Sequence, residues 1–85
     1  MGYRLEFVPS ALRELDKVPP DARRRLVRAI ERLANDPRPP GARALRENRS
    51  GLRLRVGDYW VLYQVDVEQS MITIGRVAQR GRAYR

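Results

Sequence analysis

The opening residues carry a strand pattern that changes into a helical pattern. Residues 3–8, YRLEFV, place apolar side chains at every second position, which is the period of a strand. Pro9 ends this strand, and Ser10 is the expected N-cap because its side-chain oxygen can accept a free amide N–H of the next turn. Apolar residues at helical spacing then predict a short helix that runs to about Lys17.

A second, longer amphipathic helix is predicted after the proline pair at 19–20. Asp21 favours the helix start, because a carboxylate interacts well with the free amides there. The prolines within 37–40 forbid continuation beyond about Asn35. One face of this helix is apolar and consists of Ala22, Leu26, Ala29, Ile30 and Leu33. Arginines between positions 23 and 32 take the remaining surface, which is either a solvated face or a contact with a partner.

From residue 42 onward the pattern predicts strands only. A short strand is expected over 44–46, a hairpin over 51–65 and a last strand over 71–78. The proline-rich bend before them is too short for a domain linker, so residues 1–85 form a single domain. The order of strand, two helices and three to four strands predicts an α+β fold, in which the two-helix hairpin packs on one face of a mainly antiparallel sheet.

The hairpin has a two-residue loop, and this loop sets the register of its strands. Gly57-Asp58 places glycine first, which suits a type II′ turn. Arg55 then lies opposite Trp60, and opposed residues share a face. The helices should cover the apolar face, which consists of Leu52, Leu54, Val56, Tyr59, Val61, Tyr63 and Val65. The other face carries Arg53, Arg55, Trp60, Leu62 and Gln64.

This second face allows two interpretations. Arg53 and Arg55 are spaced about 7 Å apart along the strand, which roughly matches successive phosphates of a single nucleic-acid strand. Trp60 offers a flat surface for a base, and such stacking contributes about 1–3 kcal/mol per base. Alternatively, a cation–π contact between Arg55 and Trp60 only stabilises the hairpin, by roughly 0.5–1 kcal/mol. The residues alone leave both interpretations open.

The charge of the chain favours an anionic partner. Lysine and arginine number 18 against 10 acidic residues, which gives a net charge of +8, and Lys17 is the only lysine. An excess of this size on a small domain favours polyanions or an acidic protein. A base composition that favours arginine codons is an alternative account of the choice of arginine over lysine, but it explains the net charge less well.

Several kinds of chemistry are excluded by the composition. The chain has no cysteine and no histidine, which removes disulfides, thiolate metal sites and the commonest acid–base group near neutral pH. We therefore expect no metal and no cofactor. No apolar run approaches the roughly 20 residues of a membrane helix, and no secretion leader is visible. These features predict a cytoplasmic protein without membrane contact.

The ordered combination of these elements resembles the RelE toxins of the RelE/ParE superfamily. The resemblance rests on ALRENRSGLRLRVGDYWVLYQV at 44–65, on RVAQRGRAYR at 76–85, and on the opening strand and helix pair at 3–37, so it covers nearly the whole chain. It implies an mRNA endonuclease that cuts codons in the ribosomal A site, where the toxin would contact the 16S rRNA of the ribosome. It also implies an acidic cognate antitoxin that wraps the toxin and masks its basic face.

The same resemblance implies roles for individual residues. Arg53 and Arg55 match the two basic residues of the active-site strand, and Arg46 matches a basic, RNA-binding residue just before it. Arg80 matches the catalytic arginine that follows the last strand, and Tyr84 matches the C-terminal catalytic tyrosine. RelE toxins cleave RNA without a metal, with the 2′-hydroxyl as nucleophile, so these arginines would stabilise charge on the phosphorane oxygens.

Two further positions complete the expected site. The family usually has an arginine directly after the hairpin tyrosine, and here that position is Trp60, which is expected to hold a base. Arg82 is expected to contact RNA. Tyr84 is the candidate proton acceptor, because neighbouring arginines should lower its pKa from the usual value of about 10. Alternatively, Tyr84 only orients the RNA or pins the tail to the sheet.

Two rival functions remain open at this point. A ParE-like toxin shares the fold but poisons DNA gyrase, and it needs neither the basic nucleolytic face nor the terminal tyrosine. A non-catalytic RNA-binding module would leave RNA intact, and its affinity would fall with salt at a log–log slope of about −0.7 per contacted phosphate.

Overall fold

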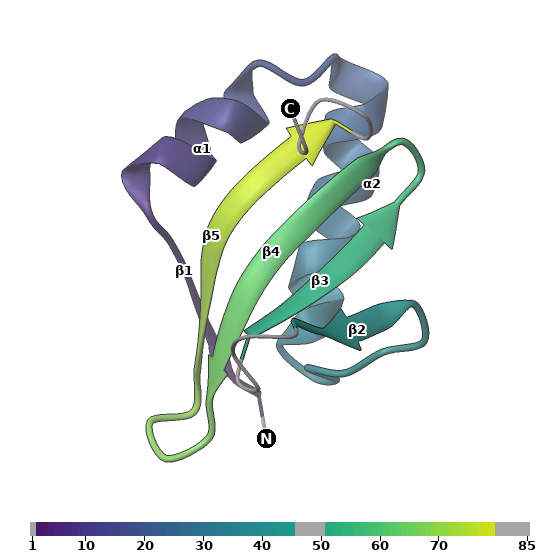
Figure 1. Ribbon diagram of the computed structural model, residues 1–85. Coiled ribbons are helices and arrows are strands. Elements are labelled where there is room, and N and C mark those ends of the chain that lie inside the picture. Colours follow the sequence, from purple (N-terminus) through teal and green to yellow (C-terminus); the bar gives the residue numbers. More distant parts are fainter. Residues whose placement is uncertain (1, 46–50, 80–85) are drawn as a thin grey trace.

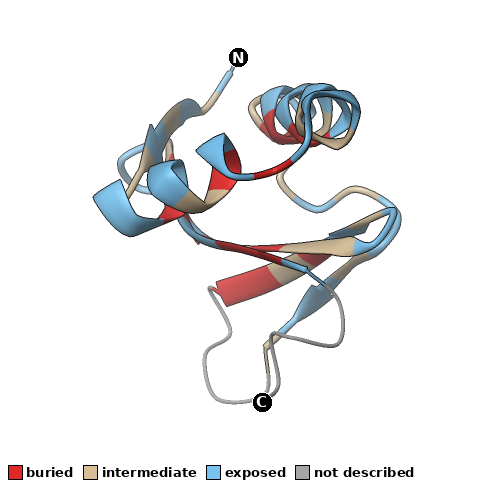
Figure 2. Ribbon diagram, turned by 90° about the horizontal axis from the view of Figure 1, so that it is seen from above, coloured by how far each residue is buried: buried red, intermediate tan, exposed pale blue. Residues whose placement is uncertain are grey.

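The computed structural model of the chain describes residues 2–45 and 51–79, which form two helices and one five-stranded sheet (Figure 1). The elements are β1 (Arg4–Phe7), α1 (Pro9–Asp16), α2 (Pro20–Leu33), β2 (Ala42–Ala44), β3 (Gly51–Val56), β4 (Tyr59–Asp66) and β5 (Met71–Gln79). The strand order is β1-β5-β4-β3-β2, with β1 parallel to β5 and every other pair antiparallel. Both helices cover the same face of the sheet (Figure 2). The predicted α+β architecture is confirmed.

The start of each helix is set by proline rather than by a capping side chain. The expected N-cap at Ser10 is wrong, because the N-cap is Val8, two residues earlier, and α1 begins at Pro9 with no side-chain capping hydrogen bond. α2 likewise begins at Pro20. Proline suits the first helical position, since its φ is already helical and it has no amide that needs a partner. Asp21 lies in the first turn of α2, as expected of a carboxylate at a helix start.

The hydrophobic core lies between the helix pair and the sheet (Figure 2). α2 contributes Leu26, Ile30 and Leu33, which are fully or almost fully buried. The apolar hairpin face predicted from the sequence is confirmed, since Leu52, Leu54, Val61, Tyr63 and Val65 are buried and Val56 and Tyr59 are partly buried near the turn. Burying one such aliphatic side chain contributes about 1.5–3 kcal/mol, so this layer provides much of the stability of so small a domain.

The short strand before the hairpin lies earlier than predicted. β2 ends at Ala44, where a strand over 44–46 was expected. Gly41 follows the prolines and has a φ of 94°, a conformation that favours glycine. β2 begins at the next residue, Ala42. Arg43 then pairs with Arg53 on β3. Arg46 lies outside the described residues.

An extra residue in β5 keeps its apolar side chains on the core side. Leu62 pairs with Arg76 and Tyr63 pairs with Ile74, so Gly75 is left over as a β-bulge. In a regular strand, residues three apart point to opposite faces. The extra residue shifts this alternation by one position. Ile74 and Val77 are therefore both buried on the core side, although they are three residues apart.

The exposed edge of β5 is covered by α1. β1 pairs with β5 only as far as Ile74. Beyond that point the backbone N–H of Val77 donates to Glu14 Oε1 at 2.8 Å, and Arg76 Nε lies 3.5 Å from Glu14 Oε2. One carboxylate therefore satisfies a strand-edge amide and an arginine, and it ties α1 to the last strand.

Substitution of Glu14 tests this link between α1 and β5. Glu14→Ala leaves the Val77 amide without its acceptor, so the free energy of unfolding should fall by about 1–3 kcal/mol. Glu31→Ala on the exposed face of α2 is the control, and it should change stability by less than about 0.5 kcal/mol. Urea denaturation followed by circular dichroism measures both. Equal losses for the two variants would contradict the proposed link.

Tyr63 provides a second, pH-dependent test of the core. Its hydroxyl donates to the Pro37 carbonyl oxygen at 2.7 Å, and burial raises the pKa of Tyr63 to about 12. The unfolded chain ionises this group near its usual pKa of about 10, so the unfolded state loses the proton first. Stability from this group is therefore complete below about pH 10 and falls as the pH rises from about 10 to 12.

The Tyr63→Phe variant should lose this alkaline slope and should also be less stable at neutral pH by about 1 kcal/mol, because the Pro37 carbonyl loses its donor. Urea denaturation at several pH values compares it with the wild-type chain. A slope that persists unchanged in Tyr63→Phe would show that other groups cause the alkaline loss.

Candidate functional site

The face of the sheet that the helices leave uncovered carries the candidate site, and the hairpin turn determines which residues lie there. Val56 pairs with Tyr59, Arg55 with Trp60 and Arg53 with Leu62, as predicted. Gly57, the first loop residue, has a φ of 58°. Asp58, the second loop residue, does not have a positive φ, because Ser70 is the only non-glycine residue with positive φ in the described part of the chain. Positive φ at the first loop position alone fits the predicted type II′ turn.

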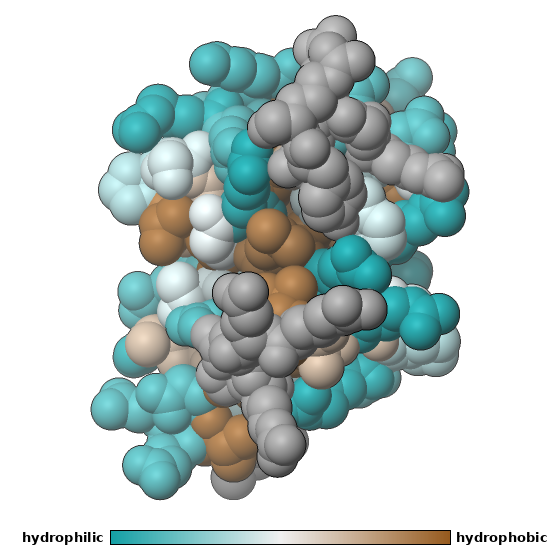
Figure 3. Space-filling view, viewed as in Figure 1, coloured by the Kyte–Doolittle hydropathy of each residue, from teal (hydrophilic) through white to brown (hydrophobic). Residues whose placement is uncertain are grey.

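This uncovered face, which we call the open face, gathers three arginines on two neighbouring strands. Arg53 and Arg55 lie on β3, and Arg43 lies opposite Arg53 on β2 and shares its face. On the side seen in Figure 3, apolar surface is visible near the middle of the molecule, with hydrophilic side chains to either side. Sequence analysis missed Arg43, because the short strand was expected two residues later.

Arg53 is held against the indole of Trp60. The Arg53 Cζ atom lies 5.0 Å from the centroid of the Trp60 ring system, which is within the range of a cation–π interaction. The two residues are diagonal neighbours, since Arg53 is directly opposite Leu62. Diagonal neighbours remain within reach of long side chains and aromatic rings. The interaction fixes the position of one guanidinium on the open face.

The alternative cation–π contact between Arg55 and Trp60 is wrong, although the two residues are directly opposite. Arg55 Nε donates to the carbonyl oxygen of Gly57 at 3.3 Å, so its side chain lies along the turn. Arg55 is exposed, whereas Arg53 is half-buried. The two strand arginines therefore differ: Arg53 is held by an aromatic ring, and Arg55 extends into solvent near the turn.

Trp60 is only partly available as a surface for a base. It is half-buried, and its Nε1 atom is enclosed without a hydrogen-bond partner. Its neighbour on β5 is Ala78, a small and nearly buried residue that leaves room for the indole. Because Arg53 lies over the ring, a base that stacks on that side would have to displace the arginine.

The structure brings Arg53, Arg55 and Trp60 together on the open face. The other expected site residues lie outside the described residues; they are Arg46, Arg80, Arg82 and Tyr84. Over 2–45 and 51–79, no group of three or more acidic, cysteine or histidine residues is placed to hold a metal ion. In the same ranges, no helix is long and apolar enough to cross a membrane.

A double-mutant cycle tests the contact between Arg53 and Trp60. Replacing Arg53 with Gln and Trp60 with Leu, singly and together, should give a coupling of about 0.5–1 kcal/mol in the free energy of unfolding. The matched cycle with Arg55→Gln should give a coupling near zero, because Arg55 bonds to the turn instead. Circular dichroism in urea measures all variants. A larger coupling for Arg55 than for Arg53 would contradict the assignment.

Comparisons of the whole chain with known proteins point to one family. The family model described as the ParE toxin of the type II toxin–antitoxin system, parDE, matches residues 5–84. Toxin RelG of Mycobacterium tuberculosis is 34% identical over 86 aligned residues, which cover 100% of this chain and 99% of RelG.

Solved structures agree with the sequence matches. The archaeal RelE–RelB complex from Pyrococcus horikoshii superposes with a TM-score of 0.85 at 28% identity, covering 96% of this chain and 99% of that one. The RelBE2 toxin–antitoxin complex from Mycobacterium tuberculosis gives a TM-score of 0.81 at 30% identity, with 94% and 100% coverage. The chain therefore belongs to the ParE toxin family of type II toxin–antitoxin systems, and within the RelE/ParE superfamily it is a RelE-like toxin.

Proposed function

We propose that this toxin is a ribosome-dependent endoribonuclease that cleaves mRNA codons in the ribosomal A site. The toxin would contact the 16S rRNA of the ribosome there. The observation that carries the proposal is the arrangement of Arg53 and Arg55 on the open face, with Arg43 beside them. A net charge of +8 supports a polyanionic substrate. The proposed substrate is found on ribosomes, so the toxin acts in the cytoplasm.

The proposed reaction uses the RNA's own 2′-hydroxyl as the nucleophile. As its oxygen forms a bond to the adjacent phosphorus, the hydroxyl proton is removed and the bond from phosphorus to the 5′-oxygen breaks. The products are a 2′,3′-cyclic phosphate and a 5′-hydroxyl, which receives a proton. Negative charge develops on the phosphorane oxygens, where arginine donors stabilise it more strongly than in the ground state.

The arginines of the open face suit this task to different degrees. Arg53 lies over Trp60, so its guanidinium is already positioned and loses little side-chain freedom when RNA binds. Arg55 is exposed and would leave its contact with the Gly57 carbonyl to reach a phosphate. We assign the fixed donor role to Arg53 and the role of a mobile phosphate contact to Arg55.

The remaining roles follow from the resemblance to RelE. Arg80 is the proposed second catalytic arginine, Tyr84 is the proposed proton acceptor, and Arg46 and Arg82 contact RNA. The chain has no histidine, so the base must be another group, and a tyrosine near several arginines is a chemically reasonable choice. In this proposal Trp60 replaces a family arginine and positions Arg53.

An antitoxin is the proposed protein partner. The relatives of known structure include toxins solved in complex with their antitoxins. We infer that an acidic cognate antitoxin neutralises this toxin by covering basic surface. Its acidic side chains would complement an excess of eight positive charges.

Cleavage of mRNA on programmed ribosomes tests the function. Arg53→Ala and Arg80→Ala should each reduce the rate by about 10²–10³-fold, the usual cost of removing one donor to a developing oxyanion. Arg13→Ala is the control, because Arg13 is exposed on α1, on the covered side of the sheet, and its rate should stay within about twofold of wild type. Unchanged cleavage by Arg80→Ala would remove its assigned role.

The match to the ParE toxin model supports poisoning of DNA gyrase as a second candidate function. A supercoiling assay run beside the ribosome assay separates the two. Inhibition of gyrase with intact mRNA would favour the ParE-like function. Salt-dependent RNA binding with neither activity would favour a non-catalytic RNA-binding module.

A further inference from the structure

A small apolar hollow lies on the open face, beside the arginine and the tryptophan described above. Its volume is about 200 Å³, and its lining includes Val8, Leu45, Leu62, Gln64, Thr73 and Gly75. Leu62 of β4 is directly opposite Arg53 of β3. Gln64 is directly opposite Thr73 of β5, and opposed residues share a face. The hollow therefore continues the surface on which Arg53 and Trp60 lie.

The bulge at Gly75 keeps this hollow open. Gly75 has no partner on β4 and adds no side chain to the wall, so a larger residue would narrow the space. A Cβ at this position would lie 3.7 Å from the Leu62 carbonyl oxygen, which is ordinary van der Waals contact. The backbone at position 75 does not have a positive φ. The fold itself therefore accepts a side chain here, and the effect of one would fall on the hollow.

The hollow combines aliphatic walls with two neutral polar side chains. Leu45 and Leu62 are half-buried and do not belong to the hydrophobic core. Gln64 and Thr73 supply an amide and a hydroxyl, and no hydrogen bond within residues 2–45 and 51–79 occupies either group. None of the described lining residues carries a charge. Apolar contact together with hydrogen bonds to the base edge is how proteins hold a single unstacked base.

We propose that this hollow binds one base of the RNA substrate, and that Gln64 gives the site a preference for adenine. The inference rests on the proposed function and deepens it, because it concerns the base specificity of the same face. Directly opposed residues on antiparallel strands have Cα atoms about 4.5–5.5 Å apart. A nucleotide whose phosphate contacts Arg53 can therefore place its base over Leu62.

The chemistry of Gln64 favours adenine as the bound base. A glutamine amide pairs with adenine through two hydrogen bonds, one from the adenine N6 amino group and one to N7. A purine also covers more of the aliphatic wall than a pyrimidine does. The indole of Trp60 is a poorer place for this base, because Arg53 lies over its ring.

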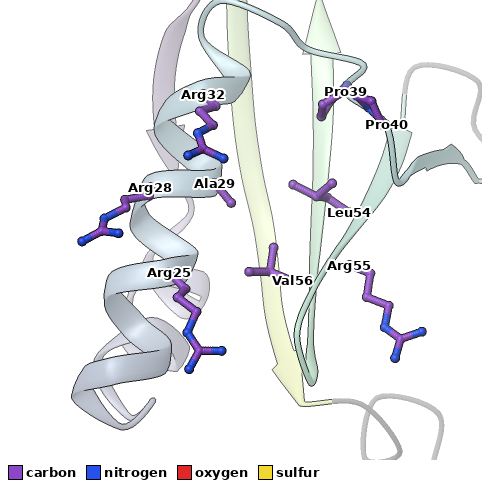
Figure 4. A pocket seen from close by; sticks show the side chains of 9 residues that line it. All are labelled: Arg25, Arg28, Ala29, Arg32, Pro39, Pro40, Leu54, Arg55 and Val56. Atoms are coloured by element: carbon purple, nitrogen blue, oxygen red, sulfur yellow. The ribbon is translucent and has the colours of Figure 1, made fainter.

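The larger groove between α2 and β3 is less suited to reading a base (Figure 4). Its volume is about 380 Å³, and Arg25 and Arg32 of α2 extend over an aliphatic floor that includes Leu54 (Figure 4). None of the described residues that line it has an amide or hydroxyl side chain. Arginines there can attract phosphates, but phosphate contacts carry no information about the base.

Binding of two short RNA probes to the purified chain tests this inference. Dye-labelled oligoadenylate and oligouridylate of equal length are titrated by fluorescence polarisation, and the ratio of their affinities is the readout. The wild-type chain should bind oligoadenylate about tenfold more tightly, as one bidentate pair provides. Every variant is compared on the same two probes, so differences in stacking within the probes cancel.

Two variants of the hollow should change this ratio. Gln64→Leu keeps the size of the side chain but removes both hydrogen bonds, so the ratio should fall to about one. Gly75→Val narrows the hollow, and it should weaken oligoadenylate binding more than oligouridylate binding. Arg53→Gln should weaken both probes to the same degree, because it removes a phosphate contact.

Gln69→Leu is the matched control, because it makes the same chemical change at an exposed position in the turn between β4 and β5. Its affinity ratio should stay within about twofold of wild type. Thermal unfolding of each variant confirms that it is folded before binding is measured.

Four results would overturn the inference. They are no binding of either probe to the wild-type chain, no preference for adenine, an unchanged ratio in Gln64→Leu, and an equal fall in the Gln69→Leu control. The assay contains no ribosomes, so each of these results leaves the cleavage proposal to its own test. Adenine preference without cleavage on ribosomes would leave the hollow assigned and remove the nuclease function.

Discussion

The two-residue turn between β3 and β4 is the constraint on which the rest of this structure depends. Gly57 adopts a backbone conformation that favours glycine, and it closes the hairpin with Arg55 opposite Trp60. Because side chains alternate along a strand, a shift of one residue would exchange the two faces. The apolar side chains would then point to solvent and the strand arginines into the core. The hydrophobic core and the candidate site therefore both depend on the register between β3 and β4.

A second local feature, the bulge at Gly75, keeps the central sheet consistent with that register. It lets Ile74 and Val77 both face the helices, and it places Ala78 beside Trp60. The indole therefore has room beside it and an arginine, Arg53, over it. Trp60 thus holds the guanidinium of an arginine on the neighbouring strand.

Positive charge lies on two adjoining surfaces with different chemistry. The open face combines arginines with a half-buried tryptophan. The groove between α2 and β3 combines Arg25 and Arg32 with an aliphatic floor, and Arg55 lies at its border with the open face. Nucleic acid and acidic protein are both polyanions, but stacked bases need flat rings and peptide side chains need aliphatic pockets. The described residues therefore present arginines beside an aromatic ring on one surface and arginines over aliphatic side chains on the other.

The sequence by itself determined the helices, the hairpin register and the α+β class, because these depend on local periodicity and on the turn residues at 57–58. It also indicated the face that carries Arg53 and Trp60. Only the tertiary structure decided that β1 lies parallel to β5, that Arg43 joins the open face, and that Arg53 rather than Arg55 contacts the indole. These outcomes depend on contacts between distant segments and on the diagonal reach of side chains across strands, which no local pattern encodes.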